Sequence, residues 1–138
     1  MGYTLEFWSV PLAQVTGGDV VAVADQVRAA GTFAGSIDHS SDGGDWFRQE
    51  FLGQLAAQLI GDQAAQHLLD RPIDGVTSTS DAQAYPALGW LSHEEITEAL
   101  THAAHPASVG ADAEDTDLLD TVLGALYSCP TDLVTIYG

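Results

Sequence analysis

Glutamate and histidine side chains suited to metal binding recur on one face of a helix that the sequence predicts after Ser92. The four are Glu94, Glu98, His102 and His105. At about 100° per residue they fall within roughly 80° of arc, and imidazole and carboxylate groups are ligands for zinc and related metals. Ile96, Leu100 and Ala103 occupy the opposite face, so the same stripe is also typical of the solvated side of an amphipathic helix.

A second possible cation site begins in the pattern Asp38-x-Ser40-x-Asp42-Gly43. Oxygen ligands at positions 1, 3 and 5 followed by glycine open a calcium-binding loop. The pattern then fails, because Gln49 stands where position 12 requires a bidentate glutamate. An acidic loop with Asx turns is the alternative interpretation.

Further carboxylates gather where the sequence predicts the start of the last helix. They are Asp112, Glu114, Asp115, Asp117 and Asp120. Clustered carboxylates can hold a divalent cation, but acidic side chains at this end of a helix are also stabilised by its dipole. Helix capping is therefore the favoured interpretation.

The sequence contains no motif that points to a catalytic group. It has neither a Gly-x-Ser-x-Gly motif nor a glycine-rich phosphate-binding or dinucleotide-binding loop. Cys129 is the single cysteine, with Pro130 after it and no helix N-terminus to activate it. We therefore predict no catalytic residue and no cofactor, and favour a protein that is not an enzyme. A lone cysteine also favours a reducing compartment, the cytoplasm.

Charge excludes two classes of partner. The 138 residues include 20 acidic and only 3 basic side chains, for a formal net charge of −17. The basic residues are Arg28, Arg48 and Arg71. They form no cluster that would neutralise nucleic-acid phosphates or an anionic membrane surface, and no apolar run reaches the roughly 18 residues of a membrane span. The sequence predicts neither a nucleic-acid nor a membrane partner.

Three interpretations of the acidity remain open. It can serve solubility, or it can reflect a high-salt habitat, in keeping with 14 Asp, 6 Glu and no lysine. It can also form a face that docks a basic protein, such as a nuclease-type toxin or a nucleic-acid-binding protein. The sequence leaves the oligomeric state open.

The docking interpretation assigns residues to two roles. Trp46 and Trp90 are the predicted anchors, since exposed aromatic side chains dominate binding hot spots. The predicted negative field comes from Asp38, Asp42, Asp45, Glu94 and Glu98. The predicted function is a non-enzymatic protein-binding or inhibitory, immunity-like module for a basic partner. The alternative is a metal-binding protein or metal-dependent enzyme that uses the Glu/His helix face or the Asp-rich loop.

Residue patterns in the first half predict the elements that position these side chains. Tyr3 to Val10 alternates as a strand. Asp19 caps a helix over residues 20–30, and residues 31–45, rich in Gly, Ser and Asp, are typical of a loop. A helix follows over about residues 45–60, and Asp62 caps a short one.

The second half predicts two helices and a strand. Residues 73–88 form a predicted loop with room for one short strand. Ser92 and Glu95 make a predicted capping box for the helix that follows. Residues 107–115 are predicted to form an acidic linker. The last helix carries Leu118 to Leu126, and residues 133–137 alternate as a terminal strand.

These elements predict an α+β fold in a single domain over residues 1–138. The length and an apolar content of 46% suffice for one core. The simplest closure pairs the first and last strands in one small sheet, with four or five helices packed on one face. Strand order stays open, since strands joined through helices can be parallel.

The C-terminal half resembles the YfbM-like group of uncharacterised bacterial proteins. The similarity is carried by Tyr85-Pro86-Ala87-Leu88-Gly89-Trp90-Leu91-Ser92-His93-Glu94-Glu95 before a helix, and by Asp132-Leu133-Val134-Thr135-Ile136-Tyr137 in the last strand. The resemblance does not extend to residues 31–80. It implies a small soluble α+β protein of unknown function, and it supplies no catalytic residue.

Overall fold

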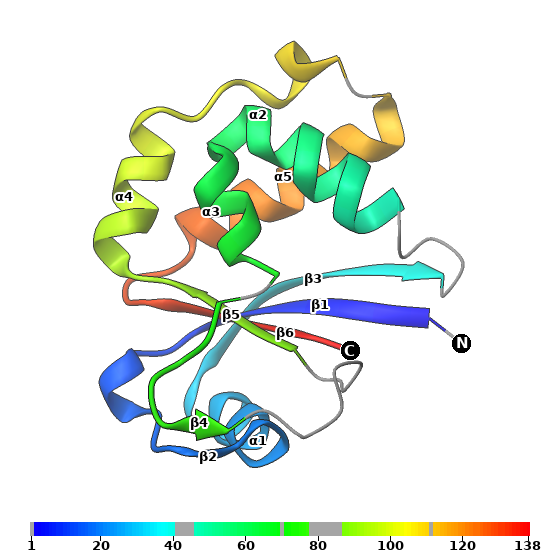
Figure 1. The fold of residues 1–138 in the computed structure, drawn as a ribbon. Helices are drawn as coiled ribbons and strands as arrows, with labels where there is room; N and C mark the ends of the chain where they lie inside the picture. The colour runs from blue at the N-terminus through cyan, green and yellow to red at the C-terminus, as the bar shows by residue number, and fades with distance from the viewer. Residues whose placement is uncertain (1, 41–45, 70, 78–86, 111) are drawn as a thin grey trace.

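A four-stranded antiparallel sheet forms the centre of the protein (Figure 1). The computed structural model describes residues 2–40, 46–69, 71–77, 87–110 and 112–138. In spatial order the strands are β3 (Thr32–Ser40), β1 (Gly2–Ser9), β6 (Leu133–Tyr137) and β5 (Ala87–Leu91). The first and last strands are therefore neighbours, and the predicted α+β fold is confirmed.

Helical segments lie on both faces of this sheet (Figure 1). On one face lie α1 (Val20–Ala30) and a small parallel sheet of β2 (Gly18–Asp19) and β4 (Val76–Thr77), with η1 (Leu12–Gln14) before them. The larger layer on the other face consists of η3 (Trp46–Ala56), α2 (Ala57–Ile60), α3 (Asp62–His67), α4 (His93–Thr101), η4 (Pro106–Val109) and α5 (Ala113–Tyr127). None of these described helices has the length and apolar character needed to cross a membrane.

The expectation that helices pack on one face only is wrong. Leu133 and Tyr137 of β6 lie in the core under the larger helical layer, whereas Val134 and Ile136 lie in a second core with α1. Every residue of β6 is buried. A strand that buries both sides needs cover on both faces of the sheet, and α1 provides the second cover.

β1 follows the predicted alternation. Leu5 and Phe7 are fully buried under the larger helical layer, and Trp8 packs on the α1 side. β1 pairs with β3 on one side and with β6 on the other. This strand therefore carries side chains into both cores.

The loop predicted over residues 31–45 is wrong for residues 32–40, which form the edge strand β3. This strand pairs with β1 along its length, and Ile37 points into the larger core, where it is fully buried. Glycine and small polar residues are typical of loops, but an edge strand with one face open to water tolerates them. Residues 41–45 lie outside the described part of the chain.

Two predicted helix starts are confirmed by their capping hydrogen bonds. Asp19 accepts hydrogen bonds from the backbone N–H groups of Val21 and Ala22, both at 3.0 Å. Ser92 and Glu95 form the reciprocal capping box of α4. Such caps satisfy backbone donors that have no partner within the helix.

Two other boundaries differ from the prediction. Gly61, rather than Asp62, is the N-cap of α3, and Asp62 is its first helical residue. Asp112 caps α5, so the end of the predicted linker over residues 107–115 is helical. Both acidic residues still lie at a helix N-terminus, where their charge is favourable.

The loop predicted over residues 73–88 contains β4 as a short strand, and its last two residues belong to β5. Residues 78–86 lie outside the described part.

η3 winds as a π-helix, and its buried positions reflect the wider turn. Its buried residues are Phe47, Phe51, Leu52 and Ala56. Buried positions thus recur every four to five residues, because each backbone N–H of a π-helix bonds to the carbonyl group five residues earlier and the turn is correspondingly wider. A helix over residues 45–60 is predicted by the same apolar pattern, and η3 with α2 confirms it from Trp46 to Ile60.

Candidate functional site

The two predicted anchors, Trp46 and Trp90, lie on opposite faces of the sheet. Trp46 packs on the larger core, with its ring centroid 5.7 Å from that of Phe51. Trp90 lies on β5 opposite Val134 and packs on the α1 side. Both side chains are half-buried. The two rings therefore do not belong to one contact surface.

Contacts within the protein hold the Trp90 ring in place. The guanidinium carbon of Arg71 lies 3.5 Å from the ring centroid, and the indole N–H donates to the carbonyl oxygen of Pro72 at 3.0 Å. Arg71 also pairs with Glu95, with 2.8 Å between nitrogen and oxygen. Trp90 is thus engaged in a cation–π contact inside the protein.

The described carboxylates predicted to form the negative field are spread over separate elements. Asp38 is exposed on β3 and accepts a hydrogen bond from Oγ1 of Thr4 at 2.6 Å. Glu94 and Glu98 are exposed on α4, which belongs to the larger helical layer. The side chain next to Asp38, Ile37, points into the larger core, so Asp38 points away from that layer.

The Glu/His stripe of α4 is not assembled into a metal site. α4 ends at Thr101, so His102 is its C-cap and His105 lies beyond the helix. Among the described residues, no three His, Cys, Asp or Glu side chains come together in a way that would hold a metal ion. Glu94 and Glu98 therefore have no geometric support as metal ligands.

The first half of the calcium-loop pattern is not a loop. Asp38 and Ser40 belong to β3 and pair with β1, and an extended strand does not wrap around an ion as a calcium loop does. Asp42, Gly43 and Asp45 lie outside the described residues.

Near the start of α5, the charges of three carboxylates act on a fourth, Asp115, and we call these four residues the acidic cluster. They are Asp112, Glu114 and Asp115 of α5 and Glu50 of η3. Burial raises the pKa of Asp115, and the negative charges of the other three raise it further. Like charges thus repel one another here, and the positive charge of a basic side chain nearby would relieve the repulsion. The sequence pattern shows the α5 carboxylates, but Glu50 joins them only through the packing of η3 on α5.

The described arginine side chains are neutralised away from the acidic cluster. Arg28 pairs with Glu6 at 2.7 Å and with Asp25 at 3.7 Å, and its hydrogen bond lowers the pKa of Glu6. Arg71 is held by Glu95.

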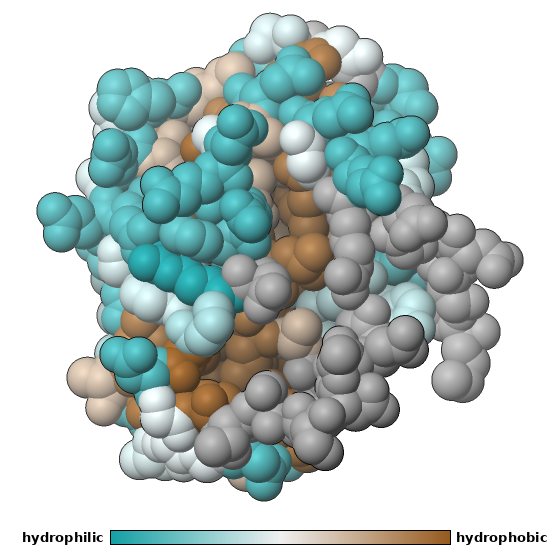
Figure 2. Space-filling model, in the orientation of Figure 1, coloured by the Kyte–Doolittle hydropathy of each residue, from teal (hydrophilic) through white to brown (hydrophobic). Residues whose placement is uncertain are grey.

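Hydrophilic residues cover much of the larger helical layer on the face seen in Figure 2.

His67 of α3 lies in an environment that disfavours its charged form. Its Nδ1 atom is buried and has no hydrogen-bond partner among the described groups. Desolvation lowers the pKa of the imidazole, and the positive charge of Arg71 lowers it further, while Glu95 acts in the opposite direction.

Acidification should therefore destabilise the protein through His67. Its folded-state pKa lies below the usual 6.5, so the unfolded chain takes up the proton first and the free energy of unfolding falls below about pH 6.5. We expect this fall to be shallower in His67→Gln, measured by urea unfolding above and below that pH. His102→Gln, which removes an exposed imidazole, is the control. An equal change in both variants would contradict the assignment.

Cys129 is placed as a packing residue rather than as a nucleophile. It is buried just after α5, and burial raises the pKa of its thiol. A thiol with a raised pKa stays protonated at neutral pH, whereas the thiolate is the reactive form.

Two large aromatic side chains of the described residues are exposed, Phe33 and Tyr127. The exposed fraction is 53% for Phe33 and 69% for Tyr127. Phe33 contacts Trp8 edge-to-face, with 5.3 Å between ring centroids. Composition predicts a loop around Phe33 and gives no orientation for its ring, whereas β3 places it on an edge strand.

No protein-family model, no curated protein and no solved structure matches this sequence. The resemblance to the YfbM-like group therefore stays a prediction that rests on the motif and strand described above.

Proposed function

We propose that this protein is a non-enzymatic binding module that recognises a basic protein through its acidic cluster. The packing of η3 on α5 carries the proposal, because it brings Glu50 near the carboxylates at the start of α5. The negative charges of Asp112, Glu114 and Glu50 add to the effect of burial in raising the pKa of Asp115. A basic side chain of the partner would lower that pKa and would gain binding free energy by doing so.

Trp46 is the better of the two anchor candidates. It lies in η3 about one turn before Glu50 and keeps part of its ring exposed, whereas Trp90 is already engaged by Arg71 and Pro72. An inhibitory, immunity-like role fits this arrangement, since an acidic face complements the basic surface of a protein that binds nucleic acid. The cytoplasm is the proposed location.

Affinity capture with two charge-matched variants tests this function. The cluster variant is Glu50→Gln/Glu114→Gln/Asp115→Asn, and the control variant is Asp74→Asn/Glu94→Gln/Glu98→Gln. Each removes three carboxylates, and Asp112 keeps its capping role in both. We expect the wild type and the control variant to retain a basic protein from the source extract at moderate salt, and the cluster variant to lose it. Equal retention by both variants, or capture of no basic protein, would contradict the proposal.

Association with the captured protein should also depend steeply on salt. Electrostatic steering is screened as the Debye length shortens, so the association rate constant should fall at least about tenfold between low and physiological ionic strength. The cluster variant should show a weaker dependence on salt. A rate that is indifferent to salt would count heavily against the acidic cluster as the docking face.

A further inference from the structure

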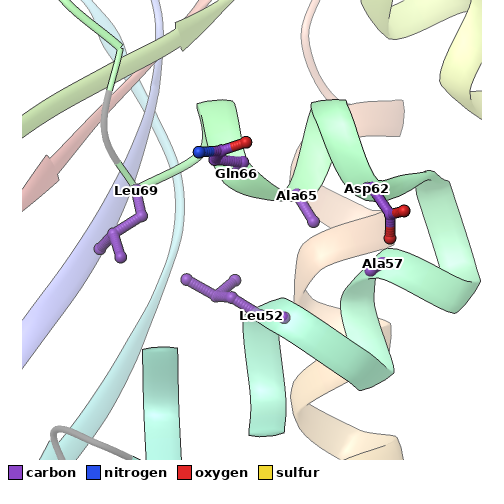
Figure 3. A pocket seen from close by; sticks show the side chains of 7 residues that line it. Leu52, Ala57, Asp62, Ala65, Gln66 and Leu69 are labelled. Carbon is purple, nitrogen blue, oxygen red and sulfur yellow. The ribbon is translucent and has the colours of Figure 1, made fainter. Parts of the chain in front are cut away.

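A pocket of about 510 Å³ lies between η3–α2 and α3 (Figure 3). Its lining residues are Leu52, Gly53, Ala57, Asp62, Ala65, Gln66 and Leu69. α3 folds back on α2 through Gly61, whose φ of +98° is a conformation that favours glycine. Gly53 has no side chain and those of Ala57 and Ala65 are short, so the space between the helices stays open. Its volume falls within the range of small-molecule sites.

The pocket combines apolar side chains and one amide with the carboxylate of Asp62 at one end. Leu52, Ala65 and Leu69 supply its apolar lining, and the first two are buried. The amide of Gln66 lies between Ala65 and Leu69 (Figure 3). Asp62 lies beside Ala57. The described lining includes no lysine or arginine, and the chain as a whole carries a formal charge of −17.

We propose that this pocket binds a small organic ammonium ion with an aliphatic tail. The tail lies against Leu52, Ala65 and Leu69, because removing methylene groups from water is favourable. The ammonium group pairs with the carboxylate of Asp62, which is exposed and therefore contributes the modest free energy of a solvated ion pair. An amphiphile with a carboxylate head would meet repulsion from Asp62. The site is separate from the acidic cluster, so the proposal goes beyond the function proposed above.

Titration of the wild-type protein with octylammonium chloride, followed through backbone amide chemical shifts, tests this proposal. We expect saturable one-to-one binding with shift changes centred on residues 52–69. Affinity should rise about fourfold for each methylene added from butylammonium to octylammonium. Sodium octanoate, which has the same chain length and the opposite charge, should bind at least about tenfold more weakly.

Two variants locate the binding groups. Asp62→Asn should weaken octylammonium binding about fivefold, whereas Asp74→Asn, which removes another exposed carboxylate, should change it by less than about twofold. Ala57→Leu should fill the pocket and weaken binding of every chain length. Octanoate binding as tightly as octylammonium, equal losses in the two aspartate variants, or shift changes spread over the acidic surface would each overturn the proposal. If Ala57→Leu does not fold, the two aspartate variants decide the question alone.

Discussion

Replacing Phe47 with alanine should lower the free energy of unfolding by about 3–5 kcal/mol, the usual cost of removing a fully buried aromatic side chain. The ring is completely buried in the larger core. Its centroid lies 4.5 Å from that of His39, 5.5 Å from that of Phe51 and 5.6 Å from that of Tyr137. Truncation therefore removes a ring that joins η3 to β3 and β6, and it leaves a cavity between a helix and the sheet.

Phe33→Ala is the matched control, because it makes the same chemical change at an exposed site. Phe33 has an exposed fraction of 53%, so loss of its ring should cost less than about 1 kcal/mol. Urea unfolding of the two variants and the wild type gives the comparison. Equal destabilisation by both changes would show that η3 does not pack against the sheet as described.

Replacing Gly89 with alanine should lower the free energy of unfolding by about 2–4 kcal/mol. An added Cβ would run into the carbonyl oxygen of His67, and it would lie 2.6 Å from Oγ1 of Thr135 and 2.9 Å from the carbonyl carbon of Leu68. The Thr135 hydroxyl, fully buried, donates a 2.5 Å hydrogen bond to that Leu68 carbonyl group. The methyl group would therefore force the end of α3 away from the sheet and strain a buried hydrogen bond.

Gly124→Ala serves as the control for the glycine change. Gly124 lies within α5, and a Cβ there would meet no atom within 4 Å. Alanine is the better helix former, so this variant should gain roughly 0.5–1 kcal/mol. Thermal and urea unfolding of both variants provide the measurement. A Gly89→Ala protein as stable as the wild type would show that α3 does not approach β5 closely at this point.

Much of the fold could be predicted because local patterns determine it. The capping box of Ser92 and Glu95 fixes the start of α4, and alternation in β1 identifies the residues that enter the larger core. Burial on both sides of β6 could not be predicted, because alternation of Val134 and Ile136 with their neighbours does not reveal what covers each face. β3 could not be predicted from the sequence for a related reason. Glycine and serine have low strand propensity, so the sequence of residues 32–40 does not read as a strand. The strand forms because these residues pair with β1, a contact between distant residues.

The candidate site was less predictable, since it depends on contacts between distant residues. The sequence shows an excess of carboxylates, but the packing of η3 on α5 brings Glu50 to Asp115. It also shows three tryptophans, but the sheet places Trp46 and Trp90 on opposite faces. The contact of Arg71 with Trp90 likewise joins the chain before β4 to β5. Such neighbours leave no periodic signal in the sequence.

The strand order has a consequence for how the protein is made on the ribosome. β1 and β3 can pair early during synthesis, whereas β5 has β6 as its one described neighbour in the sheet. β5 therefore cannot join the sheet until residues 133–137, which are made after all the other described strands, have left the ribosome. Until then the nascent chain exposes one edge of β1 and the apolar residues that β6 later covers. A chain stalled before β6 should accordingly be a substrate for chaperones and proteases, even though all of its described helices have already been synthesised.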